Sequence, residues 1–363
     1  MDLRQRLLEI GDQAGLARMG FTSLEPFPIV SDQLKSRKAS GASGGLGFTF
    51  NDPDLATTPR LSFPWGETIL VGAFPYAPAR ASALVPGTTR VSAAARAPGY
   101  APIRIALSKV AAALKQEGFR AEVLVDDNRL VDRAVAVRAG LGWWGKNTMV
   151  LAPGLGPWFL LGSVVTDARI APNQPMRRDC GSCSACIPAC PTGALVAPGL
   201  LDARRCLAAW AQTAGVIPAE FREAMGDRIY GCDDCLEACP PGQRLAINPE
   251  GIRFAIDEIL SVSDQRLLEQ FGHWFIPDRD PRVIRRNALI AAGNSGVGSL
   301  ARVVAPYAGH PDWLLRVHAV WALFRLGGPV ADAVIADRLL VESDHRVRPE
   351  LERASMAAHA SAS

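Results

Sequence analysis

The sequence predicts an α+β protein built from three consecutive parts. Apolar runs with the periods of strands and helices alternate up to about residue 170. All 8 cysteines of the 363 residues then fall between Cys180 and Cys239, and the pattern becomes purely helical beyond Pro249. We therefore expect domains at 1–170, 171–248 and 249–363, in a chain long enough to bury its own core.

The first part begins with an amphipathic helix, because Leu3, Leu7, Ile10 and Ala14 recur on one helical face. Its N-terminus lacks the layout of a signal peptide. The elements expected after it are a strand at 68–74, a helix at 103–114 that stops near Gly118, a strand at 121–125, a helix at 130–139 and a strand at 158–166.

Composition fits a soluble globular protein, with 48% hydrophobic and 21% charged residues. No run of 18 apolar residues exists, so we expect a cytoplasmic protein with no membrane span. The formal charge of +3 is too small to indicate nucleic acid by itself. Only 5 of the 39 basic residues are lysines, and Lys146 is the last of them, at a position where we do not expect Arg to substitute.

The cysteines of the second part have the spacing of a bacterial ferredoxin. The first run is Cys180-x2-Cys183-x2-Cys186-x3-Cys190-Pro, the second is Cys232-x2-Cys235-x3-Cys239-Pro, and Cys206 lies between them. In such runs the cysteine before the proline binds the other cluster of a pair. Two 4Fe-4S clusters follow, one on Cys180, Cys183, Cys186 and Cys239 and one on Cys190, Cys206, Cys232 and Cys235.

Disulfides and structural zinc are the alternatives for these cysteines. A chain of this length does not need disulfides for stability, and the C-x2-C-x2-C triplet is tighter than the paired spacing of zinc ribbons. Electron transfer is therefore part of the expected function. Helices are expected between the runs at 202–210 and 218–225.

A second candidate site lies at 125–150, VDDNRLVDRAVAVRAGLGWWGKNTMV. A predicted strand ends at Val125 and delivers Asp126 to its C-terminal rim, where α/β sheets place ligands. The alternative for Asp126 is a turn or helix-capping residue. The glycine-rich loop from Gly140 to Asn147 then brings backbone, two indoles, one cation and one amide close together.

The third part contains two related helices, PRVIRRNALIAAGN at 281–294 and PDWLLRVHAVWALF at 311–324. They share a Pro-x4-Arg frame followed closely by Ala, with Arg286 and Arg316 30 residues apart. This pattern is typical of a short HEAT-type solenoid. The small, polar tail after Arg353 is expected to be frayed.

Together these motifs resemble the epoxyqueuosine reductase family, over roughly residues 60 to 330. The residues that carry the resemblance are VDDNRLVDRAVAVRAGLGWWGKNT, CGSCSACIPACPTGAL, LDARRC and MGDRIYGCDDCLEACP, followed by the HEAT-like helices. The resemblance implies a cobalamin-binding α/β domain like that of reductive dehalogenases, a ferredoxin-like insert with two clusters, and helical repeats that face tRNA. It also implies reduction of epoxyqueuosine to queuosine at the wobble position of tRNA.

The resemblance assigns roles to residues of the first part. Asp126 falls at the position of the family's proton donor, and an apolar pocket would keep it protonated. Cobalamin is implied as the cofactor, base-off and without a protein axial ligand; all five histidines lie at or after His273. Candidates for contacts with cobalamin or substrate are Arg60, Asp126, Arg133, Lys146, Asn147 and Thr148; for each except Asp126, a plain surface or helix role is the alternative.

Substrate recognition is expected partly in the repeats, which would contact a tRNA anticodon loop carrying epoxyqueuosine. Arg282, Arg285, Arg286 and Arg316 are the candidates for phosphate contacts, with Arg325 as a fifth, and solvated helix surface is their alternative. We expect a monomer that takes electrons from a low-potential ferredoxin or flavodoxin.

Four segments depart from the family pattern: Gly44–Gly47, Ala94–Pro102, Ala208–Thr213 and Pro241–Gly242. Because they fall where substrate or cofactor contacts are expected, they favour a first rival, a related cobalamin-dependent reductase of another substrate. A second rival is a non-catalytic iron–sulfur electron carrier, which would bind no corrinoid and not need Asp126.

Overall fold

The structure is a computed structural model that describes residues 2–78, 85–96, 98–248 and 253–361. Its contacts divide the chain into two compact units that do not follow chain order. The first unit consists of Met1–Pro78, Pro98–Cys206 and Asp233–Asn248, and the second of Ala79–Ala97, Leu207–Cys232 and Pro249–Ser363. The segment predicted as a cysteine domain, 171–248, contributes to both units. The division into domains at 1–170, 171–248 and 249–363 stays a prediction.

A four-stranded sheet with the order β1-β2-β7-β4 forms the centre of the first unit. Its strands are β1 (Arg18–Thr22), β2 (Thr68–Pro75), β7 (Phe159–Thr166) and β4 (Ala121–Leu124). Every neighbouring pair is antiparallel, and β2 and β7 pair along their whole length. The strands predicted at 68–74, 121–125 and 158–166 are therefore confirmed, whereas β1 was not predicted.

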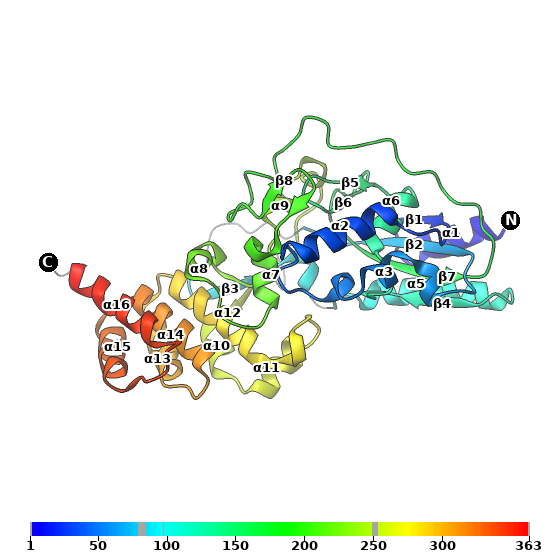
Figure 1. Cartoon of the computed structure of the whole chain (residues 1–363). Helices are drawn as coiled ribbons and strands as arrows, with labels where there is room; N and C mark the ends of the chain where they lie inside the picture. The colour runs from blue at the N-terminus through cyan, green and yellow to red at the C-terminus, as the bar shows by residue number, and fades with distance from the viewer. Residues whose placement is uncertain (1, 79–84, 97, 249–252, 362–363) are drawn as a thin grey trace. The chain divides into compact units, whose positions relative to one another are not determined.

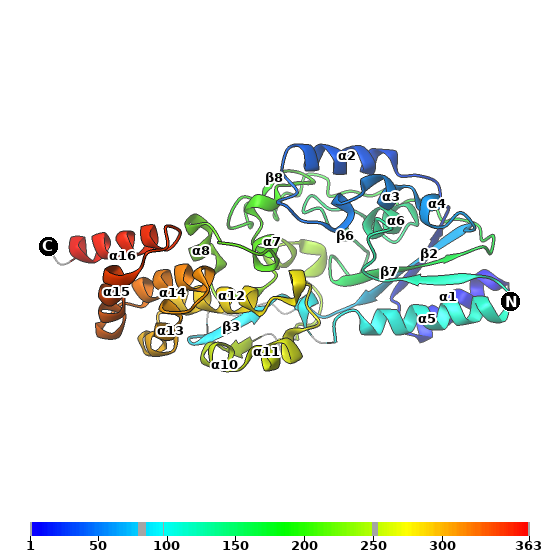
Figure 2. The ribbon, with the colours of Figure 1, turned by 60° about the horizontal axis from the view of Figure 1, so that its bottom comes forward.

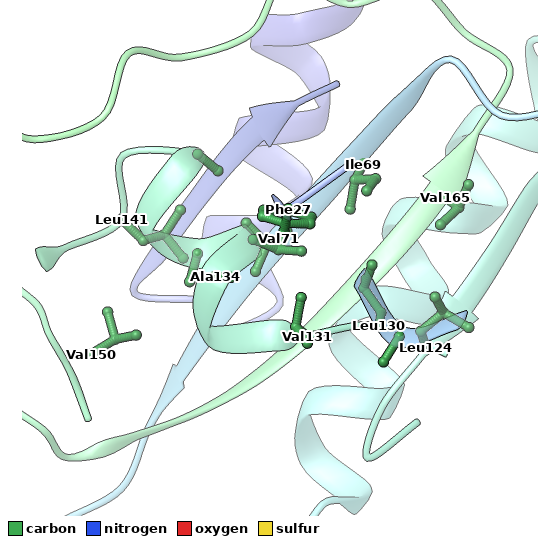
Figure 3. Close-up of a cluster of buried hydrophobic side chains, with 14 of the residues drawn as sticks. Phe27, Ile69, Val71, Leu124, Leu130, Val131, Ala134, Leu141, Val150 and Val165 are labelled. Atoms are coloured by element: carbon green, nitrogen blue, oxygen red, sulfur yellow. The ribbon is translucent and has the colours of Figure 1, made fainter. Parts of the chain in front are cut away.

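Helices cover both faces of this sheet (Figure 2). On one face α1 (Leu3–Gln13) and α5 (Ala101–Gln116) pack around the fully buried Leu7, Leu107 and Val164. The Asp2 carboxylate caps α1 by accepting from the Gln5 N–H at 2.7 Å. On the other face α2 (Pro28–Ala39), α3 (Pro53–Thr57), α4 (Pro59–Ser62) and α6 (Asp132–Arg138) enclose a second core (Figure 3).

Short elements complete the first unit. Hairpins are formed by β5 (Trp143–Trp144) with β6 (Val150–Leu151), and by β8 (Leu195–Ala197) with β9 (Leu200–Leu201). The remaining helical turns are η1 (Phe48–Phe50), η3 (Ala203–Arg205), α9 (Asp234–Glu237) and η4 (Pro240–Gly242).

The second unit combines a small sheet with helices. Its strands, β3 (Thr88–Val91), β10 (Arg228–Tyr230) and β11 (Arg253–Ala255), have the order β10-β3-β11. The helix predicted at 202–210 is interrupted at Cys206, between η3 and α7 (Leu207–Gln212). The other helices before the repeats are η2 (Ala93–Ala95), α8 (Ala219–Met225), α10 (Ile256–Ser261), α11 (Asp264–Phe271) and η5 (Pro277–Arg279).

The predicted repeats are helices (Figure 1). The helix α12 spans Pro281–Asn294, as predicted, and α14 spans Trp313–Leu326 because Asp312 caps it through the Leu314 N–H at 2.8 Å. The others are η6 (Gly298–Leu300), α13 (Ala301–Ala308), α15 (Pro329–Val341) and α16 (Arg348–Ser361). Two predictions for this region are wrong: β11 interrupts the purely helical pattern, and α16 continues to Ser361 where a frayed tail was expected.

Among the residues that the structure describes, none of the helices has both the length and the apolar character needed to cross a membrane.

Candidate active site and cysteine centre

Asp126 lies in the turn between β4 and α6 and has a positive φ of 55°. Non-glycine residues rarely adopt this left-handed conformation, and such strain is often found at functional sites. Burial raises the pKa of the Asp126 carboxyl above its usual range, the Arg104 guanidinium opposes this shift, and the neighbouring Asp127 carboxylate adds to it. The direction of this pKa shift favours the protonated form of Asp126.

The turn around Asp126 is held by two arginines. Arg104 of α5 donates to the Val125 carbonyl at 3.0 Å. Arg129 pairs with Asp127 at 2.7 Å and with Glu122 of β4 at 2.9 Å. The hydrogen bonds from Arg129 lower the pKa of Asp127, whereas burial and the charge of Asp127 raise the pKa of Asp126. The pKa values of the two adjacent carboxyls are therefore shifted in opposite directions.

Two further groups interact electrostatically with Asp126. Burial, followed by the charges of Asp126 and Asp127, raises the pKa of Asp132 to about 8. Loss of hydration, followed by the charges of Asp126 and Asp132, raises the pKa of the Tyr100 phenol to about 12. Sequence reasoning did not single out Asp132, although three aspartates within seven residues at 126–132 were a visible signal.

The loop at 140–147 is shaped by close backbone approaches. Gly140 has a φ of +72°, and a Cβ on it would lie 2.5 Å from the Gln174 carbonyl oxygen. A Cβ on Gly142 would lie 2.1 Å from the Leu151 carbonyl oxygen of β6. Only glycine fits at these two positions, so the loop backbone can lie close to Gln174 and to the strand β6.

The structure brings the first predicted cysteine set together. Cys239 packs in one buried cluster with Trp143 and Leu151, and Cys180 lies against it. Burial, followed by the negative charges of Cys180, Cys186 and Cys183, raises the pKa of the Cys239 thiol to about 12. Thiolates grouped in this way repel one another, so these thiols ionise fully only when bound iron offsets their negative charge. Such a group of thiols suits an iron–sulfur cluster.

Cys190 of the second predicted set has a different environment. Burial alone would raise its pKa, but backbone N–H groups of Leu195, Thr192 and Ala194 lower it, and the Ala194 N–H lies 3.2 Å from Sγ. N–H donors directed at sulfur stabilise the thiolate, the form that binds iron. Cys180, Cys183, Cys186, Cys190 and Cys239 are thiols outside any disulfide.

Among the described residues, no group of three or more His, Cys, Asp or Glu is arranged so that it could hold a metal ion. Thiolates on a cubane bind different iron atoms and stand farther apart than ligands of one ion. The membership of both ligand sets stays a prediction.

Four of the candidates for cofactor contacts lie close together, because Lys146, Asn147 and Thr148 are consecutive and Arg133 bonds to Thr148. Arg133 donates to the Thr148 carbonyl at 3.4 Å, and Thr148 has a positive φ of 66°. Lys146 instead donates to the Gly181 carbonyl in the first cysteine run, at 2.7 Å. Arg60 donates to the Gly66 carbonyl in the turn before β2.

Asn147 is 3% exposed, and both ends of its amide are used. Its Nδ2 donates to the Cys235 carbonyl and its Oδ1 accepts from the Met149 N–H. We therefore do not retain Asn147 as a cofactor contact, because it connects the loop to the second cysteine run.

Three of the four arginines predicted to contact tRNA are internal. Arg286 is 0% exposed and donates to the carbonyls of Trp210, Thr213 and Gly215. Arg285 donates to Asp264 and the Tyr307 hydroxyl, and Arg316 to Glu342. Arg285, Arg286 and Arg316 therefore stabilise the helices and are not placed to contact phosphates. Arg282 is half-exposed, although it pairs with Asp280 and Asp312.

Two family models match this chain. A 4Fe-4S double cluster binding domain matches residues 179–242, and HEAT repeats match residues 268–355. The first contains all eight cysteines, and the second contains the helices with the shared arginine frame.

Curated relatives and solved structures agree along nearly the whole chain. The epoxyqueuosine reductase of Bacillus subtilis is 31% identical over 97% of this chain and 95% of its own length. That of Vibrio cholerae is 37% identical over 61% of this chain and 63% of its own. An epoxyqueuosine reductase solved with a tRNA-Tyr epoxyqueuosine-modified stem loop has a TM-score of 0.89 at 31% identity and covers 97% of each chain.

A second solved structure, from Bacillus subtilis, was described with an aspartate-bearing catalytic loop swung out of its active site. It has a TM-score of 0.87 at 30% identity and covers 97% of this chain and 98% of its own. Fold, cysteine centre and repeats therefore agree from end to end with proteins of one kind. This chain belongs to the epoxyqueuosine reductase family.

Proposed function

We propose that this chain reduces the epoxide of epoxyqueuosine in tRNA to the cyclopentene of queuosine. The observation that carries the proposal is Asp126, an acid with a raised pKa in a strained turn of a chain that matches epoxyqueuosine reductases over 97% of its length. The relative bound to an epoxyqueuosine-modified stem loop supports tRNA as the substrate.

The chemistry requires an acid at this position. Converting an epoxide into an alkene removes the oxygen as water and consumes two electrons and two protons. Asp126 in its protonated form donates one proton to the departing oxygen, and the upward shift of its pKa, caused mainly by loss of hydration, favours that form. Asp132, with a pKa of about 8, is a neighbouring reservoir from which the second proton can come.

Cobalamin is the proposed cofactor, and one feature of the first unit fits it. The Arg37 Nε is buried and has no hydrogen-bond partner among the described residues. Burial and the charge of Arg133 lower the pKa of Arg37, so two cations lie near each other. They would hold an anionic group such as the phosphate of the nucleotide tail. The unit contains no histidine, consistent with base-off binding.

When bound, cobalamin would supply an electron-rich cobalt as the nucleophile. The part of the chain's own residues is to hold the proton, which we assign to Asp126. Two 4Fe-4S clusters, on the cysteine sets described above, would relay electrons from a low-potential ferredoxin or flavodoxin. We further propose a cytoplasmic location, since the proposed substrate is tRNA, and we keep the monomer as a proposal.

The test is an anaerobic preparation of the full chain with iron and corrinoid analysis. Epoxyqueuosine-modified tRNA is then supplied with a low-potential reductant, and nucleosides are measured by mass spectrometry. We expect about eight irons, one corrinoid and queuosine. Iron and corrinoid without queuosine would move the assignment to a related reductase of another substrate. Iron without corrinoid affinity would leave an electron carrier.

A further inference from the structure

We propose that Trp143 and Lys146 raise the reduction potential of the cluster on Cys180, Cys183, Cys186 and Cys239. The inference rests on the ligand set proposed above but goes beyond the overall reaction. It assigns the glycine-rich loop, which resemblance alone associates with cobalamin, a function at the iron–sulfur centre.

Lys146 is fixed over the first cysteine run. Its Nζ donates to the carbonyl of Gly181, the residue that follows Cys180, at 2.7 Å. Its own carbonyl accepts from the Gly199 N–H at 2.9 Å, so the backbone of the lysine is held as well. A positive charge this close to the cysteine run stabilises the more negative, reduced form of a cluster.

Trp143 offers the same centre a hydrogen-bond donor. The side chain is 3% exposed, and its Nε1 is buried without a hydrogen-bond partner among the described residues. The indole belongs to the packed cluster that contains Cys239 and against which Cys180 lies. Orphaned buried donors are uncommon in native structures, and an iron–sulfur cluster brings sulfur acceptors to this place.

The hairpin keeps the indole in position. Trp143 pairs with Leu151 across β5 and β6, and the absence of a Cβ on Gly142 permits this approach. The Arg178 guanidinium lies 4.3 Å from the centroid of the ring, where it polarises the N–H further. Hydrogen bonds to cluster or cysteine sulfur and nearby positive charge are both recognised ways in which proteins set cluster potentials.

A structural role predicts something different. If Trp143 only fills space, Phe should replace it without a change in potential, because Phe keeps the apolar ring but lacks the N–H. If Lys146 only closes the turn through its hydrogen bond to Gly181, removal of its charge should not change the midpoint potential of the cluster. The substitutions Trp143→Phe, Lys146→Gln and Lys146→Arg therefore separate tuning from packing.

The experiment is an EPR-monitored redox titration of the anaerobically purified full chain without tRNA. Trp143→Phe and Lys146→Gln should each shift the midpoint potential of one cluster to more negative values, and the double variant should shift it further. Lys146→Arg should stay near wild type. Lys109→Gln, on the exposed side of α5, removes the same charge elsewhere and should leave both midpoints unchanged.

Unchanged midpoints in Trp143→Phe and Lys146→Gln at full iron content would overturn the proposal. Loss of the cluster in both variants would also overturn it, because groups that only tune a potential are not needed for assembly. Cys183→Ser tests the ligand set separately: if both EPR signals survive in that variant, the ligand assignment is wrong. None of these measurements depends on whether epoxyqueuosine is the substrate.

Discussion

At the scale of single residues, the backbone of Asp126 decides which substitutions are informative. Its φ of 55° lies in the left-handed region, which asparagine tolerates better than most residues. Asn therefore preserves the turn while removing the ionisable proton. The neighbouring Asp127 is held by Arg129 and provides a matched substitution in the same turn.

Asp126→Asn should lower the rate of queuosine formation by about 10²–10⁴-fold, the usual contribution of a positioned acid. Iron and corrinoid content should stay at wild-type levels. Single-turnover assays with epoxyqueuosine-modified tRNA measure the rate, and Asp127→Asn should lose less than about tenfold. Full activity in Asp126→Asn would exclude this residue as the proton donor.

Asp132 predicts a pH dependence of stability. Its folded-state pKa of about 8 lies above its ordinary value of 3.8, so folding favours the protonated form. The stabilisation is present in full below pH 4 and is lost as the pH rises through about 8. Asp132→Asn stays neutral, so its apparent Tm should exceed that of wild type by about 2–5 °C at pH 8.

The difference should be smaller at pH 5, where most of the wild-type carboxyl is protonated in the folded state. Anaerobic thermal unfolding at one scan rate gives both values. A difference that is the same at the two pH values would show that Asp132 does not carry this linkage.

At the scale of elements, α12 is held by polar side chains that are buried, Arg286 and Asn287. Arg286 donates to three carbonyls of the segment 210–215, and Asn287 donates to the carbonyls of Ala211 and Ile229. The segment that departs from the family pattern, Ala208–Thr213, therefore contacts α12 through main-chain carbonyls, while its Ala209 and Ala211 are buried.

Arg286→Met should strongly destabilise the second unit, because it removes three hydrogen bonds from a fully buried guanidinium, at about 1–3 kcal/mol each. Arg282→Met, at the half-exposed neighbour in the same helix, should cost less than about 1 kcal/mol. Thermal unfolding of both variants measures the contrast. Equal losses would mean that the internal contacts of Arg286 contribute little.

The departure from the family pattern at Pro241–Gly242 is explained by packing. A Cβ on Gly242 would lie 2.4 Å from Nε1 of Trp158, and one on Gly156 would lie 2.5 Å from the backbone of Gly242. The fully buried Trp158 indole thus occupies the volume that a larger residue at 242 would need. The Pro241–Gly242 sequence matches this neighbour and gives no support to a different substrate.

At the scale of the whole molecule, the sequence predicts local features well and their three-dimensional arrangement poorly. The helix at 281–294 was predicted to the residue, because Asp280, Pro281 and Asn294 mark its ends. The three residues of β11 are too few to show a period. Arg285 and Arg286 were assigned to the surface because charged side chains are usually exposed. No local sequence pattern shows that Arg286 donates hydrogen bonds to the carbonyls of residues 210–215.

The sheet is a second case. Asp126 was predicted at the ligand-binding rim of an α/β sheet, yet every strand pair in the four-stranded sheet is antiparallel. The residue was identified for a reason that does not apply. Its position follows from the left-handed turn after β4, and strand order depends on long-range pairing that local periodicity does not contain.

Cys239 connects distant parts of the sequence, so it tests the ligand sets at this scale. Cys239→Ser should reduce the iron content from about eight to about four per chain, because one cubane loses a ligand and the other keeps all four. Iron analysis after anaerobic reconstitution measures the loss, and Cys190→Ser is the matched variant for the other set. Wild-type iron content in Cys239→Ser would contradict its assignment.

The position of Cys239 also bears on how the protein is made. The four strands of the larger sheet are complete once Thr166 has been synthesised, whereas the first cysteine set lacks Cys239 until the second run has been translated. A nascent chain can thus fold its larger sheet while Cys180, Cys183 and Cys186 still lack the fourth cysteine of their set, Cys239. Iron delivery must follow translation of this run, and a chain truncated before it would present exposed, oxidisable cysteines to its surroundings.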